Sequence, residues 1–266
     1  MTTDTLMAVD TLEVGDAALA FRYTGGRSPA LVFIHGAYLS AEAWRPQLGA
    51  LRGRACLFVD LRGHGRSART GYPYSVAQFA EDVKVLLRHL DLGPVVLCGH
   101  SLGGMVAQHL AAHAPHLVAK LVLADTSYGV RSSRFEALLT DAVLPLLNTV
   151  PIAWQAALFA NQIGRYSADA KRYVRREISQ HAQDPRNYRA VWRAVTQFSG
   201  QGALSRIGCP TLLMVGARNK QTHAQARVMA ERIRTSDLIY VSDAGHMLNW
   251  DNAAGFNRAL LEFAEG

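Results

Sequence analysis

Cysteine is scarce in this sequence of 266 residues, which contains three, at positions 56, 98 and 209. An odd number without paired spacing excludes a disulfide-stapled scaffold and argues against a cysteine-based metal site. Each cysteine lies in or beside an apolar, strand-like run. We therefore expect Cys56, Cys98 and Cys209 to be small side chains of the interior.

Long hydrophobic runs are also missing. The longest apolar stretches, such as residues 30–34 and 95–98, are far shorter than the roughly 20 residues of a membrane-spanning helix. The first ten residues contain neither a basic segment nor an apolar run, so they do not resemble a signal peptide. The sequence therefore predicts a cytoplasmic protein without a membrane partner.

Proline and glycine are too rare for a collagen-like chain, with 9 and 22 residues, and no low-complexity tract or internal repeat is found. Charged residues make up 18% and hydrophobic residues 49% of the sequence, which is atypical of disordered chains. The length suits one hydrophobic core with room for an insertion.

The charge is unevenly distributed. The chain carries 28 basic and 21 acidic residues, a net charge of +7, and residues 128–203 supply +5 of it. No nucleic-acid-binding motif accompanies this region, and arginine-rich helical faces are usually simply solvated. We therefore expect no nucleic-acid partner, while the sequence does not indicate the oligomeric state.

Short apolar runs bounded by glycine and proline recur along the chain. They lack a regular alternation of polar and apolar residues, so each predicts a strand that is covered on both faces, as in a parallel sheet. The predicted strands are residues 30–34, 55–59, 94–98, 121–124, 211–215 and 238–241. The predicted helices between them are residues 75–90, 102–113, 222–233 and 252–263. This alternation is typical of the α/β class with a mostly parallel, doubly wound sheet.

The alternation is interrupted between residues 128 and 203. This region contains no strand-like run, only helical patterns such as residues 135–147 and 154–163, broken by prolines. The sequence thus predicts a helical cap at residues 128–203, inserted between two core parts, residues 1–127 and 204–266. Such a cap supplies the far wall of a substrate pocket. Its candidate lining residues are Trp154, Phe159, Tyr166, Trp192 and Phe198, with Arg189 or Arg193 as a partner for an anionic group.

Residues 99–104, with the sequence GHSLGG, directly follow one predicted strand and directly precede a helix. A serine on such a sharp strand-to-helix turn needs glycines around it, because the backbone is strained and neighbouring side chains would clash. The turn exposes the Ser101 hydroxyl at the helix N-terminus, where the helix dipole favours negative charge. Ser101 is therefore a candidate nucleophile.

Four motifs occur in a familiar order: His35-Gly36, residues 60–67 (DLRGHGRS), the Ser101 turn, and residues 244–246 (AGH). Together they resemble the α/β-hydrolase superfamily over nearly the whole chain. The resemblance implies an eight-stranded sheet with a helical cap, Ser101 as nucleophile and His246 as general base. It also implies an oxyanion hole made by the backbone N–H groups of Ala37 and Leu102. Serine needs a base to accept its proton, and the tetrahedral oxyanion needs fixed donors.

The sequence contains two candidates for the residue that orients His246. Most members of the superfamily place an aspartate after the penultimate strand, but this chain has Asn219 there, and an amide carries no charge. Asp125 ends another predicted strand, and strand ends converge on one crevice. Branches similar in this respect include zearalenone-type lactonases and cofactor-independent quinolone dioxygenases. We therefore predict Asp125 as the acid, with Asn219 as the alternative.

We expect a small-molecule substrate, and its predicted pocket includes residues near these motifs as well as residues of the cap. The predicted substrate-binding residues are His35, Tyr38, His100, Trp154 and Trp192. His35 and His64 lie in loop motifs and are also typical of structural hydrogen bonding, and a regular turn would direct His100 away from the nucleophile. The remaining histidines show no ligand spacing, so we expect no metal and no cofactor.

Three functions remain open. The first is a serine hydrolase that cleaves an ester, a lactone or a C–C bond next to a carbonyl group through an acyl-enzyme. The second is a cofactor-independent dioxygenase of hydroxyquinolone-type rings that uses His246 and Asp125. The third is a non-catalytic ligand receptor, indicated by Asn219 if Asp125 has no role. The complete serine turn and oxyanion motifs favour the hydrolase.

Overall fold

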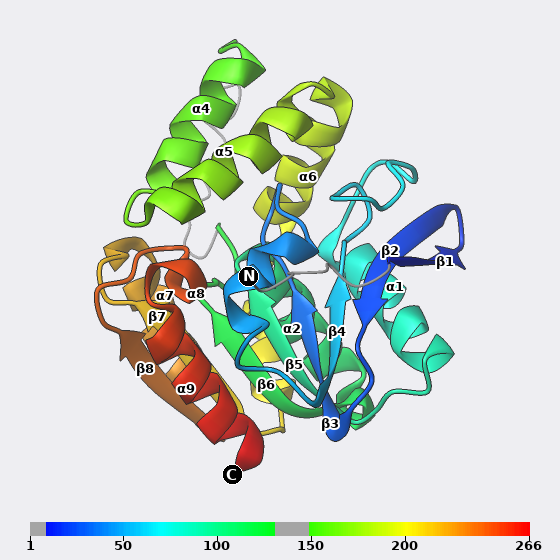
Figure 1. The fold of residues 1–266 in the computed structure, drawn as a ribbon, viewed down its shortest axis with the longest axis vertical. Helices are drawn as coiled ribbons and strands as arrows, with labels where there is room; N and C mark the ends of the chain where they lie inside the picture. Colours follow the sequence, from blue (N-terminus) through cyan, green and yellow to red (C-terminus); the bar gives the residue numbers. More distant parts are fainter. Residues whose placement is uncertain (1–8, 131–148) are drawn as a thin grey trace.

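A computed structural model describes residues 9–130 and 149–266 of the chain. Residues 135–147, predicted as helical, lie outside the described residues. The described chain forms an eight-stranded sheet in the order β1-β2-β4-β3-β5-β6-β7-β8 (Figure 1). The strands are β1 (Asp10–Val14), β2 (Ala17–Tyr23), β3 (Arg27–Ile34), β4 (Arg54–Val59), β5 (Val95–His100), β6 (Val118–Ala124), β7 (Thr211–Gly216) and β8 (Ser236–Val241).

Six neighbouring strands of the sheet pair in parallel, in the order β4, β3, β5, β6, β7 and β8. Every residue of β5 and of β7 is buried, which explains why their sequences show no polar and apolar alternation. All six predicted strands are present, and the predicted doubly wound α/β sheet is confirmed. The regular strand-helix order also explains why each apolar run could be assigned to a strand.

The first two strands were not predicted. β1 and β2 form an antiparallel hairpin whose last pair joins Val14 to Ala17, and β2 also pairs antiparallel with β4. The two-residue turn consists of Gly15 and Asp16, with Gly15 at a φ of 61°, a conformation that glycine adopts without strain. This hairpin extends the sheet at its β4 edge.

Helices cover both faces of the sheet (Figure 1). On one face, α1 packs against α2, and α2 contacts the short η3 helix, which contacts α7. On the other face, η1 contacts α8 and α9. The bounds are η1 (Ala41–Gln47), α1 (Val76–His89), α2 (Leu102–His113), η2 (Pro115–Leu117), η3 (Gln201–Arg206), α7 (Lys220–Arg232), α8 (Leu248–Asp251) and α9 (Ala253–Glu265). The sheet is thus the middle of three layers.

Among the described residues, three more helices lie above the sheet (Figure 1): α4 (Ile152–Ile163), α5 (Ala168–Ala182) and α6 (Pro185–Gln197). Ser167 caps α5 by accepting the Ala170 N–H at 3.2 Å. Asp184 caps α6, which begins with a proline, a residue that fits the first helical position. These caps fix the short turns that fold the three helices against one another.

Two tyrosines connect these helices to the core. The Tyr38 hydroxyl donates to the carbonyl of Tyr188 in α6 at 2.9 Å, and the two rings stack with centroids 4.5 Å apart. The Ser40 N–H donates to the hydroxyl of Tyr173 in α5 at 3.1 Å. The loop after β3 therefore anchors α5 and α6 to the core.

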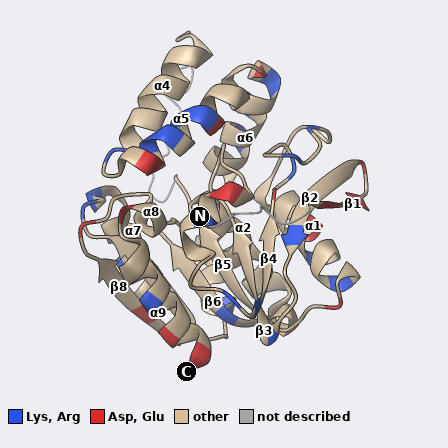
Figure 2. Ribbon diagram, in the orientation of Figure 1, with Lys and Arg blue, Asp and Glu red and all other residues tan. Residues whose placement is uncertain are grey.

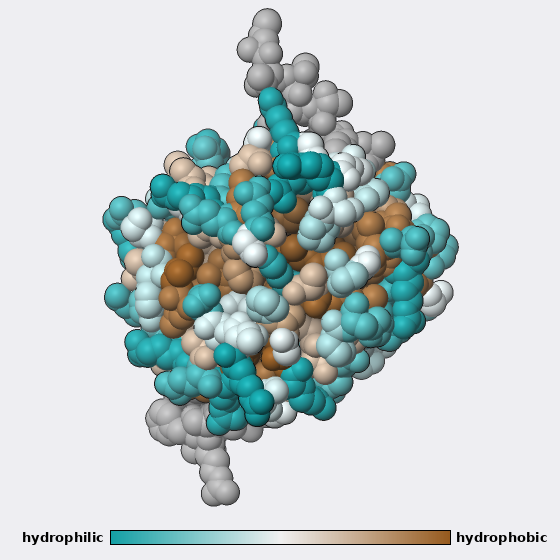
Figure 3. Space-filling view, turned by 90° about the horizontal axis from the view of Figure 1, so that it is seen from below, coloured by the Kyte–Doolittle hydropathy of each residue, from teal (hydrophilic) through white to brown (hydrophobic). Residues whose placement is uncertain are grey.

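Charged residues gather on helices and loops, while the parallel strands carry few of them (Figure 2). From the side opposite α4, α5 and α6, hydrophilic residues form a rim around hydrophobic residues at the centre of that face (Figure 3). Within the described ranges, no helix combines the length and apolarity needed to cross a bilayer. The apolar residues thus concentrate in the sheet and in its contacts with the helices.

Candidate active site

Ser101 occupies a strained turn between β5 and α2. Its φ of 53° and ψ of −117° lie in a region that residues other than glycine rarely adopt. The glycines of the turn cannot carry a side chain, because a Cβ on Gly99 would lie 2.2 Å from the Gly103 carbonyl oxygen. A Cβ on Gly103 would lie 2.1 Å from the carbonyl oxygen of Ile34. The close approach places Ser101, which is partly exposed, at the N-terminus of α2.

Two backbone N–H groups were predicted as the oxyanion donors, those of Ala37 and Leu102. Leu102 is the first residue of α2, so its N–H has no acceptor inside the helix. Ala37 follows β3 and lines the same pocket as Ser101. Among the described loops and helix ends, neither N–H donates to a backbone carbonyl. Neither N–H is thus committed to a backbone acceptor, and both remain the predicted oxyanion donors.

His246 lies in the loop after β8 and lines the same pocket as Ser101. Its backbone carbonyl lies 2.8 Å from His100 Nε2, which fixes the loop against β5. Burial, with a smaller contribution from His100, lowers the pKa of His246 to about 3. The imidazole is therefore neutral at pH 7, the form that can accept a proton. Within the described chain, no hydrogen bond yet joins its ring to Ser101; apo enzymes often show this.

Asp125 and Asn219 both lie beside His246. Asp125 Oδ2 is 3.7 Å from His246 Nδ1. Asn219 Nδ2 donates to both Asp125 carboxylate oxygens at 3.0 Å and lies 3.5 Å from the same imidazole nitrogen. Thr222 Oγ1 also donates to Asp125 Oδ1 at 2.5 Å. The two candidates for the orienting residue thus form one cluster, in which the amide holds the carboxylate.

The environment of Asp125 raises its pKa to about 7. Burial of the carboxyl group is the largest cause, because it disfavours the charged form. Hydrogen bonds from Thr222 and Asn219 oppose this effect, and the nearby carboxylate of Asp251 adds to it. Asp125 is therefore the group of this cluster whose charge changes near neutral pH.

The pocket around these residues has a volume of about 350 Å³. Its wall includes Phe159 and Ile163 of α4 and Trp192 and Val195 of α6. Of the predicted substrate-binding residues, Trp192 lies in this wall. Among the other aromatic candidates, Phe159 and Tyr166 also line the pocket, whereas Phe198 lines a separate hollow.

Four predicted substrate-binding residues lie elsewhere, which corrects their assignment. His35 is fully buried, with Nδ1 donating to the Gly36 carbonyl and Nε2 accepting the Leu61 N–H. Tyr38 is buried beneath α6, and His100 is buried against the His246 loop. Trp154 is 73% exposed on the outer side of α4. The motifs locate these residues near the site, but their side chains point into the interior or to the surface.

Three basic residues of the pocket were not predicted: Arg165, Arg218 and Lys220. Arg189 and Arg193, the guessed partners for an anion, are not among the lining residues. Thr222 was also missed. Arg218, Lys220 and Thr222 lie around the start of α7, so the position of Asn219 in the sequence was the available signal for them.

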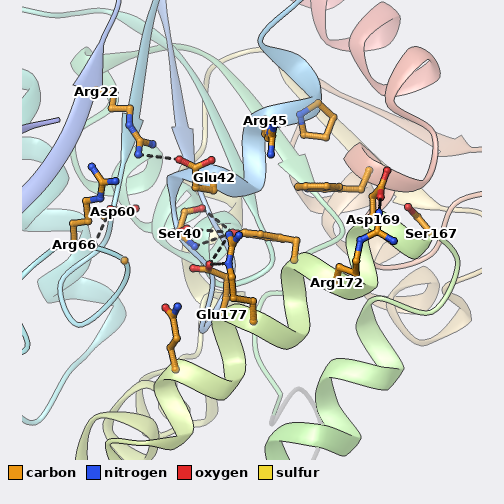
Figure 4. Close-up of a pocket in the computed structure, with 16 residues that line it drawn as sticks. Arg22, Ser40, Glu42, Arg45, Asp60, Arg66, Ser167, Asp169, Arg172 and Glu177 are labelled. Atoms are coloured by element: carbon orange, nitrogen blue, oxygen red, sulfur yellow. Dashed lines mark hydrogen bonds and ion pairs between the residues drawn. The ribbon is translucent and has the colours of Figure 1, made fainter. Parts of the chain in front are cut away.

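A second hollow, of about 1100 Å³, lies between α5 and the η1 region (Figure 4). Its acidic and basic side chains pair largely with each other, as in the ion pairs of Arg22 with Glu42 and of Arg176 with Glu177. Neither Ser101 nor His246 lines it. No histidine is among its described lining residues, whereas the smaller pocket brings Ser101, Asp125 and His246 together.

Metal chemistry has no evident site in the described part of the chain, where no group of three or more His, Cys, Asp or Glu side chains is placed to hold an ion. Cys56 and Cys98 are buried and Cys209 is half-buried, and all three are free thiols.

Comparisons with known proteins identify the family and the fold of this chain. The profile of the alpha/beta hydrolase family matches residues 31–259. Over 259 residues the chain is 27% identical to 3-oxoadipate enol-lactonase 2 of Acinetobacter baylyi, covering 94% of both chains. A hydrolase structure from Pseudomonas aeruginosa PA01 superposes with a TM-score of 0.84 and 29% identity, covering 97% of this chain and 98% of that one. The enol-lactonase from Burkholderia xenovorans LB400 shares the fold, with a TM-score of 0.80, 24% identity and coverage of 96% and 99%.

Proposed function

This chain belongs to the alpha/beta hydrolase family, and we propose that it is a serine hydrolase that cleaves a carboxylic ester or lactone through an acyl-enzyme. One observation carries the proposal: Ser101 sits in a strained turn and lines one pocket with His246 and Asp125. The names of similar proteins, which include an enol-lactonase, support the same class of substrate.

In the first half of the proposed reaction, Ser101 Oγ attacks the carbonyl carbon while His246 Nε2 takes the hydroxyl proton. The carbonyl oxygen becomes an oxyanion and accepts hydrogen bonds from the N–H groups of Ala37 and Leu102. The C–O bond to the alcohol then breaks, and His246 returns the proton to the leaving oxygen. In a lactone, this alcohol stays attached to the acyl group.

In the second half, His246 takes a proton from water, and the hydroxide formed attacks the acyl carbon. The same two N–H groups stabilise the second oxyanion, and Ser101 leaves with the proton from His246. In the free enzyme the low pKa of His246 keeps it neutral before each attack. A charged Asp125 stabilises the imidazolium that forms during each attack.

We propose Asp125 as the orienting acid and Asn219 as the residue that holds it. The support is geometric: the Asn219 amide donates to both Asp125 oxygens, and an amide alone brings no negative charge to the imidazolium. The carboxylate must approach Nδ1 more closely than 3.7 Å during turnover to share a strong hydrogen bond.

We also propose that residues 128–203 act as a cap between the core parts 1–127 and 204–266. The support is that Phe159 of α4 and Trp192 of α6 line the pocket together with Ser101 of the core. These two rings meet edge to face, with centroids 6.1 Å apart. They favour a small substrate with an apolar or aromatic part.

The test is hydrolysis of p-nitrophenyl butyrate by the wild type, the Ser101→Ala variant and the control Ser199→Ala, whose serine is exposed outside the pocket. We expect turnover in the wild type and the control, and its loss in Ser101→Ala. Turnover that persists in Ser101→Ala would contradict the proposal. Oxygen consumption with a hydroxyquinolone in Ser101→Ala would instead support the alternative, a cofactor-independent dioxygenase.

A further inference from the structure

We infer that the substrate carries a carboxylate in addition to its ester or lactone group, and that Arg165 and Lys220 bind this carboxylate. The inference rests on the proposed function, because it places the anion in the pocket of Ser101. It starts from the charges of the described residues that line this pocket: three basic side chains and a single acidic one. The basic residues are Arg165, Arg218 and Lys220, and the acidic residue is Asp125.

The acidic residue does not neutralise the basic ones. The side chain of Asp125 has no exposed surface, and its oxygens are held by Asn219 and Thr222. Its raised pKa also leaves it partly uncharged at pH 7. A molecule entering the pocket therefore meets positive charge, which attracts an anionic group and excludes a cationic one.

The three cations differ in their existing partners. Arg218 is paired with Asp243 at 2.6 Å. Arg165 and Lys220 have no carboxylate partner among the residues that the structure describes. Both side chains are exposed, so their charges are solvated in the free protein and can be shared with a ligand. These two residues are thus the ones whose charge a substrate can use.

An aromatic ring positions the guanidinium groups. The Arg165 guanidinium lies 5.1 Å from the centroid of the Tyr166 ring, and that of Arg218 lies 5.4 Å from it. Contacts of a guanidinium with an aromatic face restrain a long side chain that would otherwise move freely. Arg165 is therefore held at the pocket, where a bidentate pair with a carboxylate costs less side-chain entropy.

Lys220 adds a second positive element. It is the first residue of α7, a helix of 13 residues whose N-terminal residues 220–222 line the pocket. The positive end of the helix dipole therefore adds to the lysine charge. The wall also contains the apolar side chains of Phe159 and Trp192, and the pocket volume is about 350 Å³. The substrate class is thus a small carboxylic acid that carries an ester or lactone on a short hydrocarbon chain.

The kinetic test compares mono-p-nitrophenyl adipate with p-nitrophenyl hexanoate, two esters of equal chain length that differ by one carboxylate. We expect the wild type to favour the adipate ester at least tenfold in kcat/KM. This preference should fall about tenfold in Arg165→Gln and in Lys220→Gln, mainly through KM, which corresponds to the loss of one charge-assisted hydrogen bond. It should stay unchanged in Arg175→Gln, which removes an exposed charge outside the pocket. Equal kcat/KM for both esters in the wild type would contradict the inference.

A binding test separates this inference from the proposed hydrolysis. Titration calorimetry on Ser101→Ala compares 3-phenylpropanoate with the uncharged 3-phenylpropanamide. We expect the acid to bind at least tenfold more tightly, and Arg165→Gln to remove the difference. Equal binding of acid and amide would overturn the inference even if esters are hydrolysed. Preferential binding of the acid by a protein that turns over neither ester would support the inference and count against the hydrolase.

Discussion

Asp125 is the residue on which the electrostatics of the site depend. Its carboxylate is fully buried, and three hydrogen bonds from Asn219 and Thr222 stabilise its charged form. Burial nevertheless prevails and places its pKa at about 7. The strained φ of 42° at Asp125 and the bond of its N–H to the Met214 carbonyl fix the residue at the end of β6. The sheet thus determines the distance between this carboxylate and His246.

Replacing Asp125 with asparagine should lower kcat about 1,000-fold, because the imidazolium loses its counter-charge and its preferred tautomer. The measurement is kcat on the best ester found for the wild type. The control is Asp169→Asn, which changes an exposed carboxylate at the start of α5. A loss below tenfold in Asp125→Asn would show that another group orients His246.

The acid limb of the pH profile should report Asp125. The neutral form of His246 persists far below pH 7, so the rise of kcat/KM with pH follows ionisation of Asp125, with a midpoint at about 7. Asn219→Ala removes two hydrogen bonds that favour the charged form, so this midpoint should move upward by about one pH unit. The control Asn161→Ala, an exposed amide on α4, should leave it in place. A midpoint unchanged in Asn219→Ala would contradict this role.

For individual residues, the sequence predicted the positions that a local motif determines. The glycines around Ser101 and the strand end at Asp125 are visible in the sequence, and the structure brings both residues into one pocket. The side-chain directions of Tyr38 and Trp154 depend on how α4 and α6 pack, and a motif does not contain that information. Arg165 and Lys220 were not predicted for the same reason: they line one cavity but belong to distant chain segments.

The strand-turn-helix of β5 and α2 is the element that the site depends on most. A Cβ on Gly103 would meet a backbone oxygen of β3, which cannot move aside without disturbing the sheet. Gly103→Ala should therefore reduce the free energy of unfolding by about 3 kcal/mol. Urea denaturation measures this change.

The matched control for that substitution is Gly49→Ala, since a Cβ at Gly49 meets no atom within 4 Å. This variant should stay within about 0.5 kcal/mol of the wild type. If both variants have wild-type stability, the turn is less tightly packed against β3 than described. The comparison thus isolates the close approach of α2 from general effects of glycine replacement.

Elements buried on both faces were easy to predict, and those at the edge were not. A continuous apolar run of five residues, such as residues 30–34, is typical of a central strand in a parallel sheet. β1 carries polar and exposed residues, so it lacks such a run. The signal that could have found it is the Gly15-Asp16 pair, a known two-residue hairpin turn. α5 and α6 could have been separated in the sequence only by recognising their N-cap residues, Ser167 and Asp184.

For the whole molecule, buried histidines link the core to the helices above it. The rings of His35 and His64 lie 5.0 Å apart, and His64 lies 5.0 Å from His181 of α5. Burial lowers the pKa of His35 and His64 to about 3 and that of His181 to about 2. The unfolded chain therefore binds protons below pH 6.5 that the folded protein does not bind, and stability falls as the pH decreases.

Asp125 and Asp251 have raised pKa values, so their protonation favours the folded protein as the pH decreases and opposes the effect of the histidines. The effect of burial is therefore best tested on one histidine at a time. Between pH 6.5 and 4.5, the wild type should lose about 2 kcal/mol of stability relative to His181→Gln, because the slope rises toward 1.4 kcal/mol per pH unit below the unfolded pKa. Urea denaturation at several pH values gives both curves, and the exposed His116→Gln serves as control. Parallel curves for the wild type and His181→Gln would show that His181 also takes up a proton in the folded protein.

The acyl-enzyme mechanism depends most directly on a covalent bond at Ser101. The decisive measurement is intact-protein mass spectrometry after acid quenching of a reaction with p-nitrophenyl butyrate, followed by peptide mapping. We predict a single butyryl adduct on the peptide that contains Ser101 and none in Ser101→Ala. Rapid ester turnover without any adduct, or an adduct on another residue with Ser101 unmodified, would contradict the mechanism.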